Sequence, residues 1–126
     1  MSGSLTSSSI VIIEDSADMR SFLRKALQID GHAVKTFSNG QAALEALQTE
    51  EKPSLILIDL AMPRMGGEEF ITQYRQIYKD VKTKFLIVSS NHELKEIAQK
   101  MRADGHLEKP LDLKNLLSEV QRLIAP

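Results

Sequence analysis

Four polar segments of this chain stand directly after apolar runs, and together their side chains could carry out phosphoryl chemistry. They are Glu14-Asp15, Asp59, Ser89-Ser90 and Lys109-Pro110. Carboxylates gathered at close range repel one another strongly unless a cation lies among them. Mg²⁺ suits such a site because it binds a few carboxylates plus water and leaves room for a phosphate. A carboxylate beside Mg²⁺ and an ammonium can attack a phosphoryl donor and form an acyl phosphate.

The apolar runs that precede these groups predict buried strands. The three strongest runs are Ile10–Ile13, Leu55–Ile58 and Phe85–Val88. Each is unbroken rather than alternating, which is typical of parallel strands covered on both faces. Two weaker strands are predicted at His32–Phe37 and, as an edge strand, at His106–Lys109.

Between the strands, apolar residues recur at intervals of three and four, which predicts five helices. The stripes run over Met19–Leu27, Ala43–Leu47, Phe70–Tyr78, Leu94–Met101 and Leu113–Ile124. Five β-α repeats with short joins require right-handed crossovers. We therefore expect an α/β fold: a doubly wound, five-stranded parallel sheet in the order 2-1-3-4-5 with five helices, flavodoxin-like. Its ligand site would lie at the carboxyl ends of the strands, where the polar segments stand.

Length and composition exclude several other classes of protein. The chain has 126 residues, 42% of them hydrophobic, which is enough for one domain with a real core. Cysteine is absent, so disulfides and thiolate metal sites are excluded. A formal charge of −1 gives no general attraction to nucleic acid or anionic membrane. No apolar run reaches membrane-spanning length and no signal peptide is visible, so we expect a cytoplasmic domain over residues 10–126 behind a flexible, Ser-rich tail at residues 1–9.

The polar segments also carry a family resemblance. The four stretches that carry it are Ile13-Glu14-Asp15-Ser16, Leu57-Ile58-Asp59-Leu60-Ala61-Met62-Pro63-Arg64-Met65-Gly66-Gly67, Val88-Ser89-Ser90 and Leu107-Glu108-Lys109-Pro110. In this order the sequence resembles the receiver (phosphoacceptor) domain of bacterial two-component response regulators. The resemblance extends from about Ile10 to Ile124.

The resemblance implies a role for each matching residue. Asp59 corresponds to the phosphoacceptor, and Glu14 and Asp15 to the acidic pair that binds Mg²⁺ together with Asp59 and the carbonyl of Ala61. Ser89 corresponds to the switch hydroxyl and Lys109 to the lysine that pairs with the phosphoryl group, before a bond to Pro110 that is usually cis.

The resemblance also implies partners. The donor would be a phosphohistidine on a sensor histidine kinase or a histidine phosphotransfer protein. The domain would be a signalling phosphoprotein that assists its own phosphorylation and dephosphorylation rather than an enzyme. A homodimer is left open. The cognate kinase, and any output domain in a longer protein, cannot be read from the sequence.

Two features depart from the family pattern. His106 stands where the family usually has Tyr or Phe as a rotating switch residue. The stretch from Ser89 to Lys109 is slightly shorter than we expect for close relatives, which predicts a short loop after the fourth strand. Both features bear on signalling output and not on the acceptor chemistry, and the histidine predicts a weaker or pH-sensitive coupling.

Other interpretations of these residues stay open at this point. The acidic pair could stabilise a helix N-terminus, Ser89 or Ser90 could cap a helix, and Lys109 could be an edge-strand lysine. A Mg²⁺-dependent phosphohydrolase of the haloacid-dehalogenase type would also use an Asp after a strand. That family, however, wants a second Asp at the position of Ala61, and a cap domain. A degenerate receiver that acts as a constitutive docking or dimerisation module is the third possibility.

Overall fold

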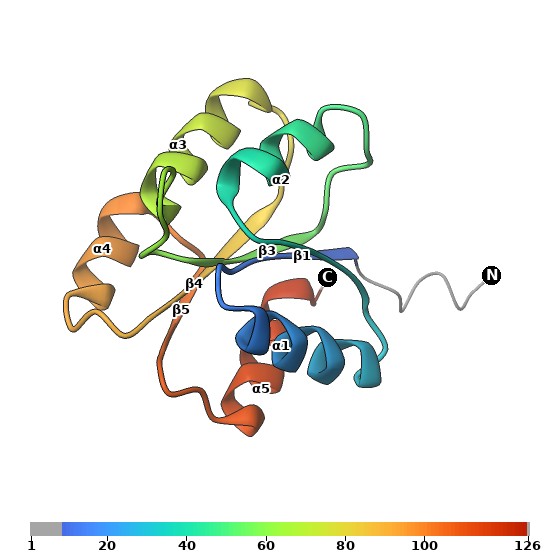
Figure 1. Cartoon of the computed structure of the whole chain (residues 1–126), viewed down its shortest axis with the longest axis vertical. Helices are drawn as coiled ribbons and strands as arrows, with labels where there is room; N and C mark the ends of the chain where they lie inside the picture. Colours follow the sequence, from blue (N-terminus) through green and yellow to red (C-terminus); the bar gives the residue numbers. More distant parts are fainter. Residues whose placement is uncertain (1–8, 126) are drawn as a thin grey trace.

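The chain folds into alternating strands and helices. The computed structural model describes residues 9–125. The strands are β1 (Ser9–Ile13), β2 (Ala33–Phe37), β3 (Leu55–Asp59), β4 (Lys84–Ser89) and β5 (Gly105–Glu108). The helices are α1 (Ala17–Ile29), α2 (Gly40–Leu47), α3 (Gly67–Ile77), α4 (Leu94–Met101) and α5 (Leu113–Ile124). The strands pair in parallel in the order β2-β1-β3-β4-β5, which confirms the predicted topology (Figure 1).

Helices cover both faces of the sheet, α2, α3 and α4 on one side and α1 and α5 on the other (Figure 1). The apolar runs serve both layers because successive side chains of a strand point to opposite faces. In β1, Val11 and Ile13 pack with the first group of helices, while Ile10 and Ile12 pack with the second. This is why the runs are unbroken.

The strand ends differ slightly from those predicted. Ser9, expected in the tail, is the first residue of β1 and lies opposite Ala33 of β2; residues 1–8 of that predicted tail lie outside the described part. Strands β3 and β4 continue through the polar residues Asp59 and Ser89. Backbone pairing defines a strand end, and it continues past the last apolar side chain.

Some members of the predicted apolar stripes are exposed. Phe22 of α1 is 41% exposed, Ile77 of α3 is 54% exposed and Leu113 of α5 is 47% exposed. In α1, α3 and α5 the apolar stripe is therefore wider than the surface that the sheet covers.

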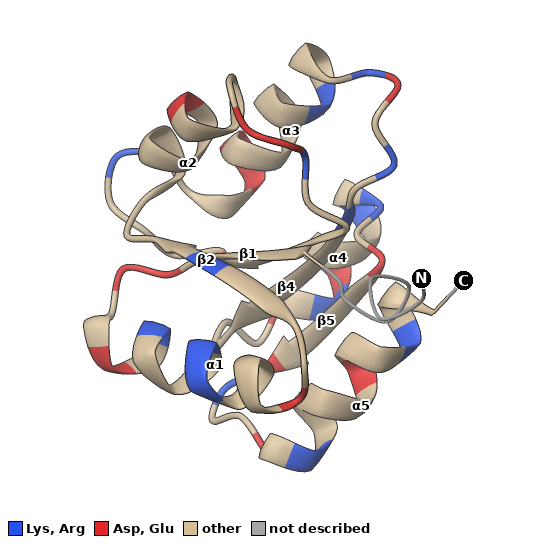
Figure 2. Ribbon diagram, turned by 90° about the vertical axis from the view of Figure 1, so that its right-hand side faces the viewer, with Lys and Arg blue, Asp and Glu red and all other residues tan. Residues whose placement is uncertain are grey.

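Charged residues of both signs are interspersed along the ribbon, as Figure 2 shows. Among residues 9–125, no helix combines the length and apolar character needed to span a membrane.

Candidate functional site

Three carboxylates meet at the carboxyl edge of the sheet. Ile13 of β1 lies opposite Ile58 of β3, so Glu14 and Asp59 stand at the same level. One oxygen from each of Glu14, Asp15 and Asp59 lies within 4.8 Å of the other two. Glu14 and Asp59 are buried, 2% and 7% exposed, whereas Asp15 is exposed. The structure therefore brings together the three carboxylates named from the sequence.

Lys109 lies between two of these carboxylates. Its Nζ donates to Oε1 of Glu14 and to Oδ2 of Asp59, both at 3.0 Å. It reaches them from the residue after β5, where its backbone N–H donates to the carbonyl of Ser89 and its bond to Pro110 is cis. Burial alone would lower the pKa of Lys109, but the bonds to Asp59 and Glu14 outweigh burial and raise it, so the ammonium stays charged. Lys109 is thus part of the cluster and not a free edge-strand lysine.

The carboxylates suit a hard divalent cation. Burial raises the pKa of Glu14, against the opposing effect of its hydrogen bonds from Ser16 and Lys109. Three carboxylates outnumber the single ammonium, and an additional cation would favour their ionised forms. Asp15 is open to solvent, and an all-oxygen donor set of this kind favours Mg²⁺ over softer metals.

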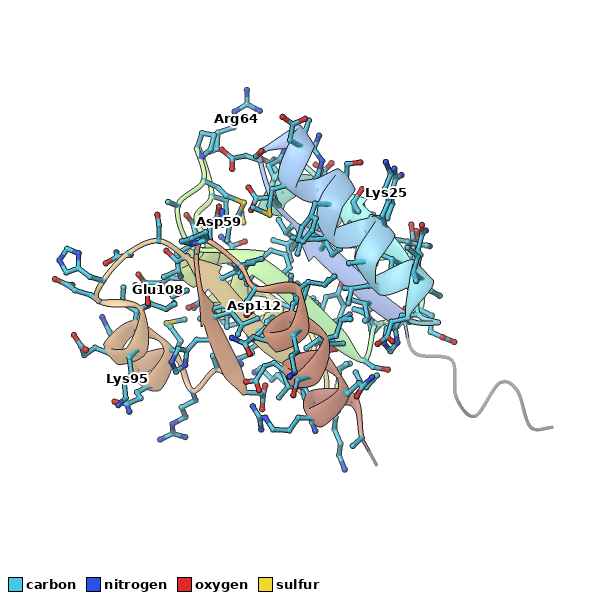
Figure 3. The ribbon with its side chains drawn as sticks, turned by 90° about the horizontal axis from the view of Figure 1, so that it is seen from below. Lys25, Asp59, Arg64, Lys95, Glu108 and Asp112 are labelled. Atoms are coloured by element: carbon cyan, nitrogen blue, oxygen red, sulfur yellow. The ribbon has the colours of Figure 1, made fainter. Side chains whose placement is uncertain are left out.

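The loop after β3 holds Asp59 in place. Oδ1 of Asp59 accepts from the backbone N–H of Ala61 at 3.1 Å, and Ala61 is exposed beside the cluster. The loop then folds back on the strand so closely that a Cβ on Gly67 would lie 2.8 Å from the carbonyl oxygen of Asp59. Figure 3 shows Asp59 at the sheet edge and Arg64 on the loop, pointing away from the body. Gly67 allows an approach that a side chain would prevent.

Arg20 is a contributor that the sequence did not reveal. Its Nη1 donates to the carbonyl oxygens of Glu14 and Asp15, at 2.8 and 3.1 Å. It reaches them from the first turns of α1, which begins after the N-cap Ser16. Its partners are backbone atoms, so the only signal in the sequence is an arginine spaced five and six residues from the acidic pair.

Ser89 ends β4 with its side chain buried, 2% exposed. Its Oγ accepts from the backbone N–H of Asn91 at 3.0 Å, so it caps the start of the next loop. Ser90 is exposed. The loop that follows spans residues 90–93, and α4 then begins at Leu94.

His106 is not among the residues that form the acidic cluster. It is exposed on β5 and lines a shallow hollow of about 230 Å³. The hollow is also lined by Asn91, His92, Leu94, Lys95 and Glu108. The two histidines of this hollow therefore lie on the α4–β5 surface and not at the carboxylates.

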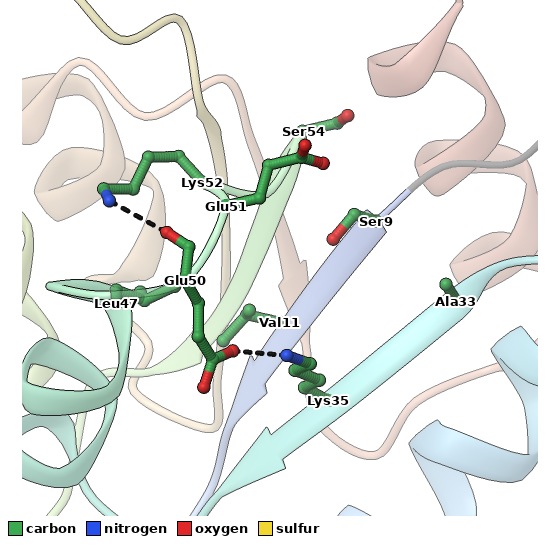
Figure 4. A pocket seen from close by; sticks show the side chains of 9 residues that line it. All are labelled: Ser9, Val11, Ala33, Lys35, Leu47, Glu50, Glu51, Lys52 and Ser54. Carbon is green, nitrogen blue, oxygen red and sulfur yellow. Dashed lines mark hydrogen bonds and ion pairs between the residues drawn. The ribbon is translucent and has the colours of Figure 1, made fainter.

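A larger hollow lies elsewhere. It measures about 450 Å³ and lies at the amino ends of β1 and β2, beside the end of α2 (Figure 4). Val11 and Leu47 line it, and an ion pair between Lys35 and Glu50 crosses it. It is at the opposite end of the strands from Asp59, so size alone does not mark the chemical site.

Known proteins resemble this chain over most of its length. Residues 10–121 match the family model described as "Response regulator receiver domain". The "Response regulator receiver protein CpdR" of Brucella abortus is 37% identical over 115 residues, covering 91% of this chain and 95% of that protein. The "Transcriptional regulatory protein PrrA" of Mycobacterium tuberculosis is 29% identical over 98% of this chain, which spans 53% of that protein.

A solved structure agrees as well. The chemotaxis protein CheY4 of Vibrio cholerae matches with a TM-score of 0.84 and 28% identity, over 94% of this chain and 99% of that one.

Proposed function

Because this chain belongs to the response regulator receiver domain family of two-component systems, we propose that Asp59 accepts a phosphoryl group from a phosphohistidine donor in a Mg²⁺-dependent reaction. The observation that carries the proposal is the Lys109 ammonium, bonded at 3.0 Å to both Glu14 and Asp59 within the carboxylate cluster. A carboxylate in this setting is poised as a nucleophile and its negative surroundings are partly neutralised.

The proposed transfer forms one bond and breaks one. A carboxylate oxygen of Asp59 bonds to phosphorus while the phosphorus–nitrogen bond of the donor breaks, and the imidazole leaves with the electron pair and takes up a proton. Lys109 balances negative charge that builds up on the phosphoryl oxygens. Glu14, Asp15, Asp59 and the carbonyl of Ala61 would hold Mg²⁺, which supplies further charge neutralisation and orientation when bound.

The acyl phosphate is then lost by attack of water on phosphorus, which regenerates the Asp59 carboxylate. The chain assists both steps by placing these groups, and signalling rather than turnover of a substrate is its role. In this phosphorelay proposal, the donor is a sensor histidine kinase or a histidine phosphotransfer protein. The domain acts in the cytoplasm and does not contact nucleic acid directly. Formation of a homodimer is one possible output.

Phosphorylation adds about 1.5–2 negative charges and three acceptor oxygens, so a nearby element must move to meet them. We assign that movement to Ser89, whose hydroxyl is the switch group, and to the surface around α4 and β5 that includes His106. His106 is exposed, which supports a coupling between Asp59 and the α4–β5 surface that differs from the coupling through a buried aromatic ring at this position.

The test uses a small phosphoryl donor, acetyl phosphate, with and without Mg²⁺. Intact-protein mass should rise by one phosphoryl group only when Mg²⁺ is present, and Asp59→Asn should abolish the gain. Undiminished labelling of Asp59→Asn would place the nucleophile elsewhere. Failure of the wild-type chain to take up any phosphoryl group would favour the degenerate receiver. Multiple turnover of phosphate esters would favour a phosphohydrolase, although that family wants an Asp at the position of Ala61.

A further inference from the structure

The carboxyl end of α4 is held by an arginine of the neighbouring helix. Arg75, in the last turn of α3, donates from Nη1 to the carbonyl of Met101 and from Nη2 to that of Arg102, the latter at 2.9 Å. Its guanidinium carbon also lies 5.1 Å from the centre of the Phe85 ring of β4. Two of the carbonyls that a helix end leaves unpaired are thereby bonded to a charged, planar group.

The chain after this point is fixed as well. Arg102 ends α4 in the left-handed conformation, with φ of 55°. The next residue, Ala103, donates its N–H to the carbonyl of Ala98 at 2.9 Å and packs against the core. Asp104 then exchanges two bonds with the backbone of Phe85: its N–H donates to the Phe85 carbonyl, and its carboxylate accepts from the Phe85 N–H. The end of α4 is therefore tied to both α3 and β4.

The amino end of α4 is held differently. Its N-cap residue, Glu93, makes no side-chain capping bond. Two side chains bond the preceding loop, beside one backbone bond from the N–H of Leu94 to the carbonyl of Asn91: Oγ of Ser89 accepts from the N–H of Asn91, and Oδ1 of Asn91 accepts from the N–H of Glu93. If the Ser89 hydroxyl turns toward a phosphoryl group on Asp59, its bond to Asn91 is lost. The bonds of Arg75 involve no atom of this loop.

We propose that Arg75 is a positioning residue that makes the carboxyl end of α4 a fixed pivot, so that phosphorylation moves the amino-terminal half of the helix and not its last turn. This inference rests on the proposed function of Asp59 and Ser89. It adds to that function the direction of the movement and the residue that sets it. Figure 1 shows α3 and α4 side by side on the same face of the sheet, as this contact requires.

The experiment measures amide hydrogen exchange along α4 with and without Mg²⁺ and beryllium fluoride, a stable mimic of the phosphoryl group. The variants are Arg75→Lys, which keeps the charge but cannot span two carbonyls, and Arg75→Ala. Arg24→Ala removes an exposed arginine from α1 on the other face and serves as the control. Because the readout is a ratio between two states of one variant, a general loss of stability does not imitate the effect.

In the wild-type chain and in Arg24→Ala, the mimic should change exchange at residues 90–97 and leave residues 98–104 nearly unchanged. In both Arg75 variants the mimic should also change the amide exchange rates of residues 98–104, by about fivefold. A fivefold change is the amount expected when the bonds of Arg75 no longer contribute roughly 1 kcal/mol to the stability of the helix end. An equal response along the whole wild-type helix, or an unchanged pattern in both Arg75 variants, would overturn the pivot. Absence of any response to the mimic in the wild-type chain, with no phosphoryl uptake from acetyl phosphate, would instead overturn the proposed function on which the pivot depends.

Discussion

Single charged groups set the properties of the acidic cluster. Glu14 and Asp59 are buried and share one ammonium, that of Lys109, while Asp15 faces solvent. Burial raises the pKa of Glu14, so keeping it ionised costs free energy that a nearby cation offsets. In the proposed function, divalent cation binding and acceptance of a phosphoryl group would both depend on this excess of negative charge.

The position of the acidic pair depends on Arg20. The variant Arg20→Lys keeps a positive charge but replaces the planar guanidinium, whose Nη1 bonds the carbonyls of both Glu14 and Asp15, with an ammonium on a flexible stem. We expect Mg²⁺ affinity to fall by about tenfold, the lower end of the range for groups that orient metal ligands. Titration of Mg²⁺ against amide chemical shifts gives the dissociation constant. Arg24→Lys, one turn further along α1, is the control and should bind as the wild type does; equal affinity in all three proteins would contradict the role of Arg20.

Site residues that could be predicted from the sequence differ in their bonding partners from those that could not. Side chains at the ends of apolar runs, such as Asp59 and Lys109, are found from their position alone, because parallel strands bring their carboxyl ends to one edge. Arg20 and Arg75 bond to backbone carbonyls, which every residue possesses. No pattern of residue types marks such a contact, so only the folded chain reveals it.

Among the elements, the β4–α4 connection separates two adjacent serines. Ser89 is buried at the end of β4, whereas Ser90 lies beyond the strand and is exposed. Only Ser89 holds the loop, through its bond to Asn91. The two hydroxyls therefore have different consequences when removed.

Ser89→Ala should leave Asp59 able to accept a phosphoryl group but blunt the response of α4. Ser90→Ala should alter that response little. Amide shifts of residues 91–97, recorded with and without Mg²⁺ and beryllium fluoride, measure both effects. The reverse pattern, with Ser90→Ala blocking the response and Ser89→Ala silent, would mean that the wrong hydroxyl has been assigned.

The β3–α3 loop is the second element that bears on the site. Gly67→Ala places a Cβ 2.8 Å from the carbonyl oxygen of Asp59 and 3.1 Å from Cα of Leu60, so backbone must move. We expect the free energy of unfolding to fall by about 1–3 kcal/mol and phosphoryl uptake to slow. Chemical denaturation measures the first effect.

A matched substitution in the same loop should act in the opposite direction. Arg64 has a φ of 71°, which glycine adopts without strain, so Arg64→Gly should leave the free energy of unfolding unchanged or raise it by up to about 1 kcal/mol. If the Gly67→Ala protein is as stable as the wild type, the backbone around position 67 can accommodate a Cβ, which would contradict this prediction.

For the whole molecule, hydrophobic pattern alone predicted the architecture. The aliphatic runs of β1, β3 and β4 are unbroken because helices cover both faces, and the β-α order required right-handed crossovers, which suit the observed strand order. The exact strand ends were not predicted, as with Ser9 and Ser89, because pairing continues through polar residues. The exposure of Phe22 and Ile77 could not be predicted either. An apolar stripe predicts which face of a helix packs against the sheet, but not how much of that face is buried.

The surface formed by α4 and β5 is where the site would communicate with a partner. His106 is exposed there, and the family usually has an aromatic residue at this position. We expect His106→Tyr to enlarge the amide shift changes that the phosphoryl mimic causes in α4, because an apolar ring gains more than an imidazole from moving inward. His92→Tyr, in the same hollow but before α4, is the control. Equal responses of the wild type and His106→Tyr would remove position 106 from the coupling.

The central claim is that Asp59 becomes an acyl phosphate, and chemical reduction tests it most directly. Borohydride reduces an aspartyl phosphate to homoserine, a permanent mark that peptide mass spectrometry locates. After incubation with acetyl phosphate and Mg²⁺, homoserine should appear at position 59 and at no other aspartate, and removal of Mg²⁺ with a chelator should prevent it. Homoserine at another position, or phosphoryl uptake without any homoserine, would contradict the account.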